Sequence, residues 1–436
     1  MPNPASRVPD FGDPSLLTGG LSTMARELRG SEILRIAAEV RAMIASGRQV
    51  CNLTVGDFDP RHFPVPTPLK ALIAKALESG ETNYPPSDGM LSLRRAVTSY
   101  VEREHGVASP VESVLITAGG RPAIYGLFRC LVNPGDSVVY GVPSWNNDYY
   151  TAMLGARGIP VATEAAEGFQ PTAALLQPHL AEASLLCLCS PGNPTGTTLP
   201  REALKAILEA VVAENRRRLS AGGRPLFVLY DLMYGSLVFG GAAHPHPVTL
   251  VPASAPWVIT VDGISKAFAA TGLRVGWAIG APAVISRLKD FLGHVGAWAP
   301  RPEQIATAEF LMDPQAISAF RCEMHRALEA RLTALFDGFT ALRQSGHPVD
   351  CVRPQGAMYL SLQLDLVGKR VDGQVVANNE EIRSLLLSRA GLAVVPFQAF
   401  GFAGESGWFR LSAGAVSLED IAAAWPRLTA MLQAVA

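Results

Sequence analysis

The sequence predicts an α/β protein, in which helices cover a mostly parallel sheet and a smaller α+β domain is formed from both chain ends. Two observations support this prediction. Short apolar runs bounded by glycine and proline recur through the middle of the chain, as in strands buried on both faces, and longer periodic stretches alternate with them. Strands that alternate with helices favour parallel connections, and ligands then bind beyond the carboxyl ends of the strands.

The large domain is predicted from six of these apolar runs. Residues 201–219 repeat apolar side chains at helical spacing, which predicts a helix between two strands. The predicted strands cover residues 113–117, 137–140, 184–189, 226–229, 257–261 and 275–279.

After about residue 313 the pattern changes and predicts the smaller α+β domain. A helix over 314–345 leads into a β-rich stretch at 356–364, and two more helices are predicted over 379–390 and 418–435. A helix over 24–46 precedes the large domain and is expected to pack with this C-terminal part. The chain is therefore divided into a flexible arm (1–20), the first part of the small domain (21–64), the large domain (65–313) and the rest of the small domain (314–436).

Composition excludes several classes of protein. Charged residues make up 17% of the 436 residues and the formal net charge is -1, which argues against nucleic acid as a partner. The six cysteines form no C-x-x-C pair or cysteine–histidine cluster, so we expect reduced thiols and no metal site. The membrane-like window 225–243 contains Asp231 and three glycines, so we expect no membrane partner. The amino terminus lacks a basic stretch followed by an apolar core, which predicts a cytoplasmic protein.

The segment 263–276, Gly-Ile-Ser-Lys-Ala-Phe-Ala-Ala-Thr-Gly-Leu-Arg-Val-Gly, is the most informative one. Lys266 follows an apolar strand and has small and apolar neighbours. Loss of hydration there lowers the pKa of its ammonium group, and the free amine can form a Schiff base. Arg274 can present a planar cation to a phosphate. An isolated lysine and arginine would more often be solvated surface charges, but a motif of this length after a strand favours function.

This segment resembles the pyridoxal-phosphate attachment motif of the class I/II aminotransferases, which are fold type I enzymes. The resemblance extends from about Leu53 to the C-terminus and is nearest to the prokaryotic aspartate aminotransferase branch. It implies a seven-stranded sheet in the large domain, pyridoxal 5'-phosphate as the cofactor and Lys266 as the catalytic lysine.

Three further motifs resemble the parts of this family that hold the cofactor ring. In Leu-Tyr-Asp-Leu-Met-Tyr, Asp231 is expected to pair with the pyridine nitrogen and Tyr234 to bond the 3-oxygen. Asn193, in Asn-Pro-Thr-Gly, is expected to donate to the same oxygen, and Trp145 to stack on the ring. Without a cationic partner, Asp231 would be an unpaired charge in an apolar run, which is an expensive arrangement.

The phosphate of the cofactor is expected at a glycine-rich turn that leads from a strand into a helix. Such a turn exposes backbone N–H groups and the positive end of the helix dipole. The resemblance also implies that Tyr84 reaches the phosphate of a neighbouring subunit, so a homodimer with shared active sites is expected. The other predicted phosphate residues are Gly120, Arg121, Pro122, Ser265 and Arg274.

The substrate residues come from both ends of the chain. Arg410, in Trp-Phe-Arg-Leu-Ser, is expected to hold the α-carboxylate through a bidentate pair, and Gly56 to contact the same group. Arg121 and Arg29 are candidates for binding a distal carboxylate, which favours a dicarboxylic substrate. Asn193 and Trp145 are expected to contact the substrate as well.

The resemblance implies ping-pong transamination between an L-amino acid of the aspartate or glutamate type and a 2-oxo acid such as 2-oxoglutarate. Gly263 and the pair Phe397-Gln398 depart from the family pattern, and a bulky Phe397 is expected to reshape the substrate pocket. The alternatives are an aromatic or alanine-type aminotransferase, a β-lyase or synthase on the same fold, and a binding or regulatory protein that kept the cofactor fold. A nicotinamide-binding protein is disfavoured because no G-x-G-x-x-G follows the first strand.

Overall fold

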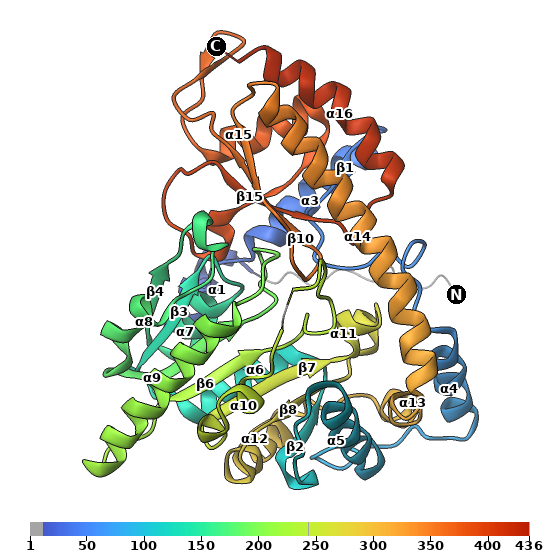
Figure 1. Cartoon of the computed structure of the whole chain (residues 1–436), viewed down its shortest axis with the longest axis vertical. Helices are drawn as coiled ribbons and strands as arrows, with labels where there is room; N and C mark the ends of the chain where they lie inside the picture. Colours follow the sequence, from blue (N-terminus) through green and yellow to red (C-terminus); the bar gives the residue numbers. More distant parts are fainter. Residues whose placement is uncertain (1–11, 243, 436) are drawn as a thin grey trace.

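The computed structural model describes residues 12–242 and 244–435. Its larger part is built on a seven-stranded sheet, which lies in the lower half of Figure 1. The strand order is β2-β8-β7-β6-β5-β3-β4, and β8 alone runs antiparallel to its neighbours. This arrangement confirms the predicted α/β class. The strands are β2 (Val114–Thr117), β3 (Ser137–Val142), β4 (Arg157–Ala162), β5 (Ala183–Cys189), β6 (Phe227–Asp231), β7 (Val258–Gly263) and β8 (Gly276–Ile279).

Helices cover both faces of this sheet, because alternate strand side chains enter two different cores. In β3, Val138 and Tyr140 pack with α6, α7 and α12, whereas Val139 packs with α8 and α9. The helices around the sheet are α4 (Thr67–Glu78), α5 (Leu91–His105), α6 (Gly120–Leu131), α7 (Asn147–Leu154), α8 (Ala173–Leu180), α9 (Arg201–Ser220), α10 (Pro247–Leu250), α11 (Ile264–Ala267), α12 (Pro282–Val295) and α13 (Arg301–Leu311).

The six predicted strands are confirmed with shifts of one or two residues at their ends, but β4 was missed. Its sequence, Arg-Gly-Ile-Pro-Val-Ala, is mostly exposed or half-buried and contains no continuous apolar run. It lies at the edge of the sheet and pairs only with β3, which explains why a proline and a polar end are tolerated there.

A second, antiparallel sheet in the order β14-β15-β10-β9 packs against helices from the C-terminal part. Cys51 and Leu53, from the amino-terminal part, share one apolar core with α14, β10 and α16. Figure 1 shows α3 and β1 beside these C-terminal elements. The remaining elements are β1 (Cys51–Asn52), α14 (Pro314–Gln344), β9 (Val349–Val352), β10 (Tyr359–Leu364), β11 (Arg370–Val371), β12 (Gln374–Val375), α15 (Asn379–Leu385), β13 (Leu392–Ala393), β14 (Val395–Pro396), β15 (Trp408–Ser412) and α16 (Leu418–Gln433).

The prediction of one continuous helix over 24–46 is wrong. The chain forms α2 (Thr23–Glu27) and α3 (Glu32–Ala45), and Leu28 and Ser31 on either side of the break have extended backbones. Gly30 lies within the break, and serine is a favoured residue at a helix start, so both residues favour an interruption here. Similarly, the predicted helix over 379–390 ends as a π-helical turn (Leu386–Ala390) after α15.

The expected flexible arm falls partly outside the described residues, which begin at residue 12. Within it the chain forms one short helix, α1 (Pro14–Thr18). The domain boundaries at residues 20, 64 and 313 remain predictions. Within residues 12–242 and 244–435, no helix has the length and apolar character needed to cross a membrane, and no three histidine, cysteine or acidic side chains are grouped as metal ligands.

Candidate functional site

A cavity of about 510 Å³ opens beyond the carboxyl ends of the central strands, and we call it the lysine cavity. Strand β7 leads into α11, which carries Lys266, and β2 leads through a turn into α6. Segments from both chain ends complete its walls. The cavity brings together ten of the predicted site residues: Gly56, Gly120, Arg121, Trp145, Asn193, Tyr234, Ser265, Lys266, Arg274 and Arg410.

Lys266 is nearly enclosed, with only 9% of its surface exposed. Its Nζ donates a hydrogen bond of 2.6 Å to the backbone carbonyl oxygen of Gly56. Burial lowers the pKa of Lys266 to about 8, because the ammonium form loses hydration in this environment. Roughly a tenth of the amine is therefore unprotonated at about pH 7, far more than for an ordinary lysine, and is available as a nucleophile or base.

Asp231 is the last residue of β6, and its carboxylate lacks a cationic partner among the described residues. Its Oδ1 accepts a hydrogen bond of 2.9 Å from the backbone N–H of Met233. Burial raises the pKa of Asp231 to about 6. A buried carboxylate of this kind gains most from a cationic group placed against it, which fits the protonated ring nitrogen of a pyridine.

Asn193 and Tyr234 form one connected group with two residues from the second sheet. Asn193 accepts a hydrogen bond of 3.2 Å from Arg410 through Oδ1, and its Nδ2 donates to the Tyr234 hydroxyl at 3.5 Å. The Tyr234 hydroxyl lies 2.6 Å from that of Tyr359. Tyr359 was not among the predicted site residues, because its surroundings in the sequence indicate only a β-rich stretch.

Arg410 is 2% exposed and has no carboxylate partner among the described residues. Its guanidinium lies between the rings of Tyr359 and Phe400, at 4.7 and 4.9 Å from their centroids. It donates 2.6 Å from Nη2 to the carbonyl oxygen of Thr54, whereas its buried Nε has no partner in this part of the structure. A buried guanidinium with an unused N–H suits the carboxylate of a ligand.

The turn between β2 and α6 is shaped to hold an anion. Gly119 has φ +80° and precedes α6, whose first N–H groups have no acceptor within the helix. Arg274 lies against this turn and donates 2.8 Å from Nη2 to the carbonyl oxygen of Ala118. Residues with a Cβ rarely adopt the positive φ of Gly119, and a Cβ there would also crowd this guanidinium, so the turn favours glycine. Together with Ser265, this turn fits the phosphate of a cofactor.

Two more arginines line the cavity without a carboxylate partner in the described chain. The guanidinium of Arg121 lies 4.8 Å from the centroid of the Trp145 ring. Arg41 extends from α3, on the face that also carries Ile33 and Ala37. Arg41 was missed at the sequence level, although its helical spacing from Ile33 and Ala37 places all three on one face.

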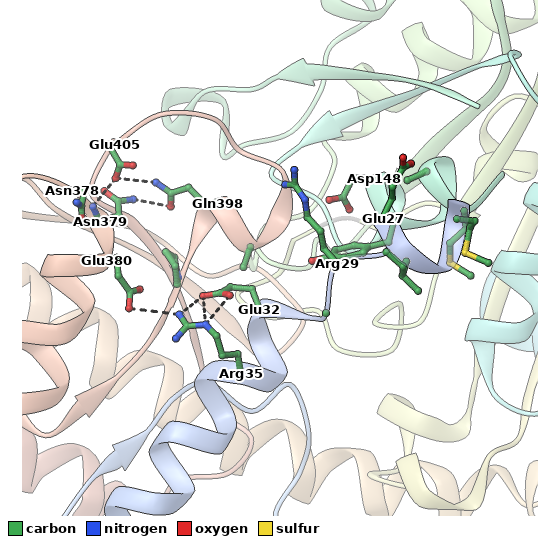
Figure 2. Close-up of a pocket in the computed structure, with 18 of the residues that line it drawn as sticks. Glu27, Arg29, Glu32, Arg35, Asp148, Asn378, Asn379, Glu380, Gln398 and Glu405 are labelled. Carbon is green, nitrogen blue, oxygen red and sulfur yellow. Dashed lines mark hydrogen bonds and ion pairs between the residues drawn. The ribbon is translucent and has the colours of Figure 1, made fainter. Parts of the chain in front are cut away.

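Besides Asp231, three of the predicted residues do not line the lysine cavity. Pro122 is the third residue of α6. Tyr84 is 82% exposed and contacts Trp298, with the ring centroids 5.4 Å apart. Arg29 lies in the break between α2 and α3 and lines a second cavity of about 1180 Å³, which we call the wide cavity (Figure 2).

Phe397 and Gln398, which depart from the family pattern, do not line the lysine cavity either. Phe397 is fully buried and stacks on Trp408, with the ring centroids 6.2 Å apart, in an apolar core that includes Phe169. Gln398 lines the wide cavity. The expected reshaping of the substrate pocket by Phe397 therefore finds no support in this structure.

A family model for the class I and II aminotransferases matches residues 48–428. The chain belongs to this family. It is 32% identical over 388 residues to a probable aspartate/prephenate aminotransferase of Thermus aquaticus, covering 88% of this chain and 93% of that protein. It is also 32% identical over 409 residues to an aspartate aminotransferase of Streptomyces avermitilis, covering 92% of this chain and 94% of the relative.

Solved structures agree with this family. The aspartate aminotransferase of Rhizobium meliloti matches with a TM-score of 0.86 and 26% identity, over 95% of this chain and 99% of that one. The Thermus thermophilus enzyme with maleate matches with a TM-score of 0.84 and 28% identity, over 95% and 100%. The protein is thus an aminotransferase of the aspartate aminotransferase branch, a family whose members use pyridoxal phosphate. The expected enzyme class and sheet are confirmed.

Proposed function

We propose that this aminotransferase binds pyridoxal 5'-phosphate in the lysine cavity and transfers amino groups between an L-amino acid of the aspartate or glutamate type and a 2-oxo acid such as 2-oxoglutarate. One observation carries this proposal. Five cationic side chains line the cavity, whereas Asp57 is the one carboxylate among its described lining residues. Such a site favours a ligand set with several negative charges. The cations are Arg41, Arg121, Lys266, Arg274 and Arg410.

The residues present fit the cofactor. Arg274, Ser265 and the first turn of α6 would hold its phosphate, and Trp145 would stack on its ring. Asp231 would pair with the ring nitrogen, while Asn193 and Tyr234 would donate to the ring oxygen. Bound there, pyridoxal phosphate supplies an electron sink for the negative charge that develops at the substrate Cα.

The chain's own groups then handle the carboxylate and the proton. Arg410 orients the α-carboxylate through its free N–H groups, which fixes the Cα–H bond relative to Lys266. The Nζ of Lys266, with a pKa of about 8, can take up and return the Cα proton near neutral pH. Asp231 would favour the protonated form of the cofactor's ring nitrogen by charge pairing.

Arg121 and Arg41 are available to bind a second acidic group of the substrate. Both lack a carboxylate partner in the described chain, and both line the same cavity. The T. thermophilus relative was solved with maleate, a dicarboxylate. A dicarboxylic donor is therefore our first candidate. The apolar side chains of Ile33, Leu34 and Met233 in the same wall favour an aromatic donor as the second.

We also propose that the enzyme works as a homodimer in which Tyr84 reaches the cofactor phosphate in the partner's site. Tyr84 is exposed in the single chain and does not line the lysine cavity of its own chain, and both observations support this. Mixing Tyr84→Ala chains with Lys266→Ala chains tests it, because a mixed dimer contains one site with both native residues. Recovery of activity on mixing supports shared sites, and its absence contradicts them.

The absorption spectrum of the purified protein after reconstitution with pyridoxal phosphate tests the main proposal. We expect a visible band that converts to that of pyridoxamine phosphate on addition of L-aspartate or L-glutamate, and that returns with 2-oxoglutarate or oxaloacetate. A band that moves only with aromatic donors would favour the second candidate. Release of pyruvate and ammonia without an acceptor would indicate the β-lyase alternative, and no band would contradict the proposal.

A further inference from the structure

Tyr359 lies where the second sheet enters the lysine cavity. It is the first residue of β10, is 1% exposed, and lines the cavity with its side chain. Its hydroxyl is 2.6 Å from that of Tyr234, and its ring lies 4.7 Å from the guanidinium of Arg410. One buried tyrosine thus contacts both a residue assigned to the cofactor and a residue assigned to the substrate.

Two loops of the lysine cavity pack against Tyr359: the loop of Gly56 and the loop that contains Asn193 and Gly196. A Cβ at Gly56 would lie 2.9 Å from the Tyr359 hydroxyl oxygen, and the carbonyl oxygen of Gly56 accepts the hydrogen bond from Lys266. A Cβ at Gly196, in the loop of Asn193, would collide with the carbonyl oxygen of Tyr359. Both loops therefore pack directly on this residue, which leaves its side chain little freedom to move.

Either hydroxyl of the tyrosine pair could donate to the other, and the neighbouring hydrogen bonds restrict which of them can also donate into the cavity. A phenol has one proton to donate and two lone pairs to accept. The Oδ1 of Asn193 accepts from Arg410, which turns its Nδ2 toward the Tyr234 oxygen. Tyr234 can donate its own proton into the cavity only if the Tyr359 hydroxyl donates to Tyr234. Among the described residues, the Tyr359 hydroxyl has no other hydrogen-bond partner.

We propose that Tyr359 is a positioning residue that donates to Tyr234, so that Tyr234 donates to the ring oxygen of bound pyridoxal phosphate, while the Tyr359 ring keeps Arg410 in place. This inference rests on the proposed function, because it requires the cofactor in the lysine cavity. Hydrogen bonds in a chain strengthen one another, so the Tyr359 hydroxyl makes Tyr234 a stronger donor. A stronger donor stabilises negative charge on the ring oxygen.

The variant Tyr359→Phe tests the hydroxyl alone, since it keeps the ring. We expect the pH midpoint of the visible band of the reconstituted enzyme to rise by about 0.3 to 1 pH unit, because a weaker donor favours the more protonated state. The KM for the amino acid should stay within about twofold, because the ring still packs on Arg410. Tyr125→Phe is the matched control; this α6 tyrosine lies 5.8 Å from Tyr150, does not line the cavity, and should leave the midpoint unchanged.

Three further variants can disprove the inference. Tyr234→Phe should raise the midpoint at least as much as Tyr359→Phe, and the double variant should show no shift beyond Tyr234→Phe, because Tyr359 acts through Tyr234. Tyr359→Leu removes the ring and should raise the KM of the amino acid several-fold. Unchanged midpoints, or additive shifts in the double variant, overturn the inference.

The outcomes separate this inference from the proposed function. If the wild-type protein develops no visible band with pyridoxal phosphate, the proposed function fails and the inference fails with it. If the wild-type band is present and titrates at the same pH in the wild type and in Tyr359→Phe, the inference alone fails. Melting curves of the apoproteins identify a variant that is unfolded. If Tyr359→Phe is unfolded, Tyr359→Leu, which also lacks the hydroxyl, provides the midpoint, and an unchanged midpoint there overturns the inference.

Discussion

Residues next to the α2–α3 break line two cavities, and these two cavities differ in the charged side chains that line them. The wide cavity is more than twice as large as the lysine cavity and is lined by many carboxylates, including Glu27, Asp148 and Glu405. Figure 2 shows that its polar groups largely bind one another: Arg35 pairs with Glu32 and Glu380, and the Asn379 amide donates 3.0 Å to Gln398. In the lysine cavity, Arg41 and Arg121 lack such partners in the described chain.

The comparison shows that volume does not identify a reactive site. What distinguishes the smaller cavity is that groups in it or near it have a charge or hydrogen-bonding capacity that the described protein does not satisfy. The Nε of Arg410, in the cavity, has no acceptor, and Asp231, two residues before the cavity-lining Met233, has no cation. Leaving such groups unpaired costs stability, so their gathering at one place indicates that a ligand satisfies them.

The largest effect is expected for Lys266→Ala. Loss of the amine removes both the covalent anchor and the group that moves the Cα proton, so we expect turnover to fall by at least about a thousandfold. Steady-state assays with aspartate and 2-oxoglutarate measure it. Glu27→Gln, in the wide cavity, is the control and should retain normal turnover. A near-normal rate for Lys266→Ala would remove the basis for the proposed mechanism.

Arg410→Gln should raise the KM for every amino acid by about a hundredfold. The substitution removes a charged bidentate pair from a buried site, and such losses typically amount to 2–5 kcal/mol. Because the α-carboxylate is common to all donors, acidic and neutral amino acids should be affected alike. A loss restricted to acidic donors would mean that Arg410 binds the distal carboxylate instead.

Asp231→Asn should stabilise the apoprotein while it impairs turnover. The folded-state pKa of about 6 lies above the ordinary value of 3.8, so the native state binds the proton more tightly than the unfolded chain does. Its ionised form therefore destabilises the fold above pH 6, and this penalty fades as the pH falls toward 3.8. We expect a gain of about 2 kcal/mol in unfolding free energy at a pH of about 7.5 and less than half of that at about pH 4.5. Denaturant titrations at both pH values measure it, and an equal gain at both would contradict burial as the cause.

Arg121→Gln and Arg29→Gln distinguish the two cavities directly. Arg121 lines the lysine cavity, so its loss should raise the KM for aspartate and glutamate about tenfold and leave that for alanine unchanged. Arg29 lines the wide cavity, and we expect a change below about twofold. A selective loss of acidic donors in Arg29→Gln would restore the role that the sequence predicts for it.

The smallest effect is expected for Arg41→Gln, because this arginine is exposed and its interactions are screened by solvent. A selective rise of about threefold in the KM for dicarboxylic donors would place the distal carboxylate near α3. Arg35→Gln removes the same charge from the same helix, but its partner is Glu32, so it is the matched control. Equal effects of the two substitutions would indicate a general charge effect rather than binding.

The predicted residues that the structure gathers best are those at strand ends and in short motifs. Lys266 follows the buried strand β7, and Asp231 ends β6. Arg274 lies just before β8, and because β8 is antiparallel to β7, its amino end lies at the same edge of the sheet as the carboxyl end of β7. Local pattern and topology therefore agree. The role of Tyr359 could not be read in this way. It meets Tyr234 across 125 positions of the chain, and such a contact depends on how the second sheet packs on the first.

The position of Arg29 could not be predicted from the sequence pattern either, although it depends on residues close to it in the chain. In a continuous helix over 24–46, Arg29 would belong to the same helix as the residues of α3. The chain is instead interrupted at residues 28–31, and Arg29 lines the wide cavity. Arg41 lies beyond the break, on the α3 face that lines the lysine cavity. Helix periodicity predicts which residues share a face, but it does not predict which of two neighbouring cavities that face lines.

By itself, the sequence determined the α/β class, the family and the residues of the short motifs, because strand burial, glycine turns and a strand-end lysine leave local patterns in the chain. Only the tertiary structure decided which charges remain unpaired, which cavity receives Arg29 and Arg41, and which hydroxyl supports Tyr234. These properties depend on distances between segments far apart in the chain. Such distances follow from the packing of the two sheets and the helices around them, to which every part of the core contributes.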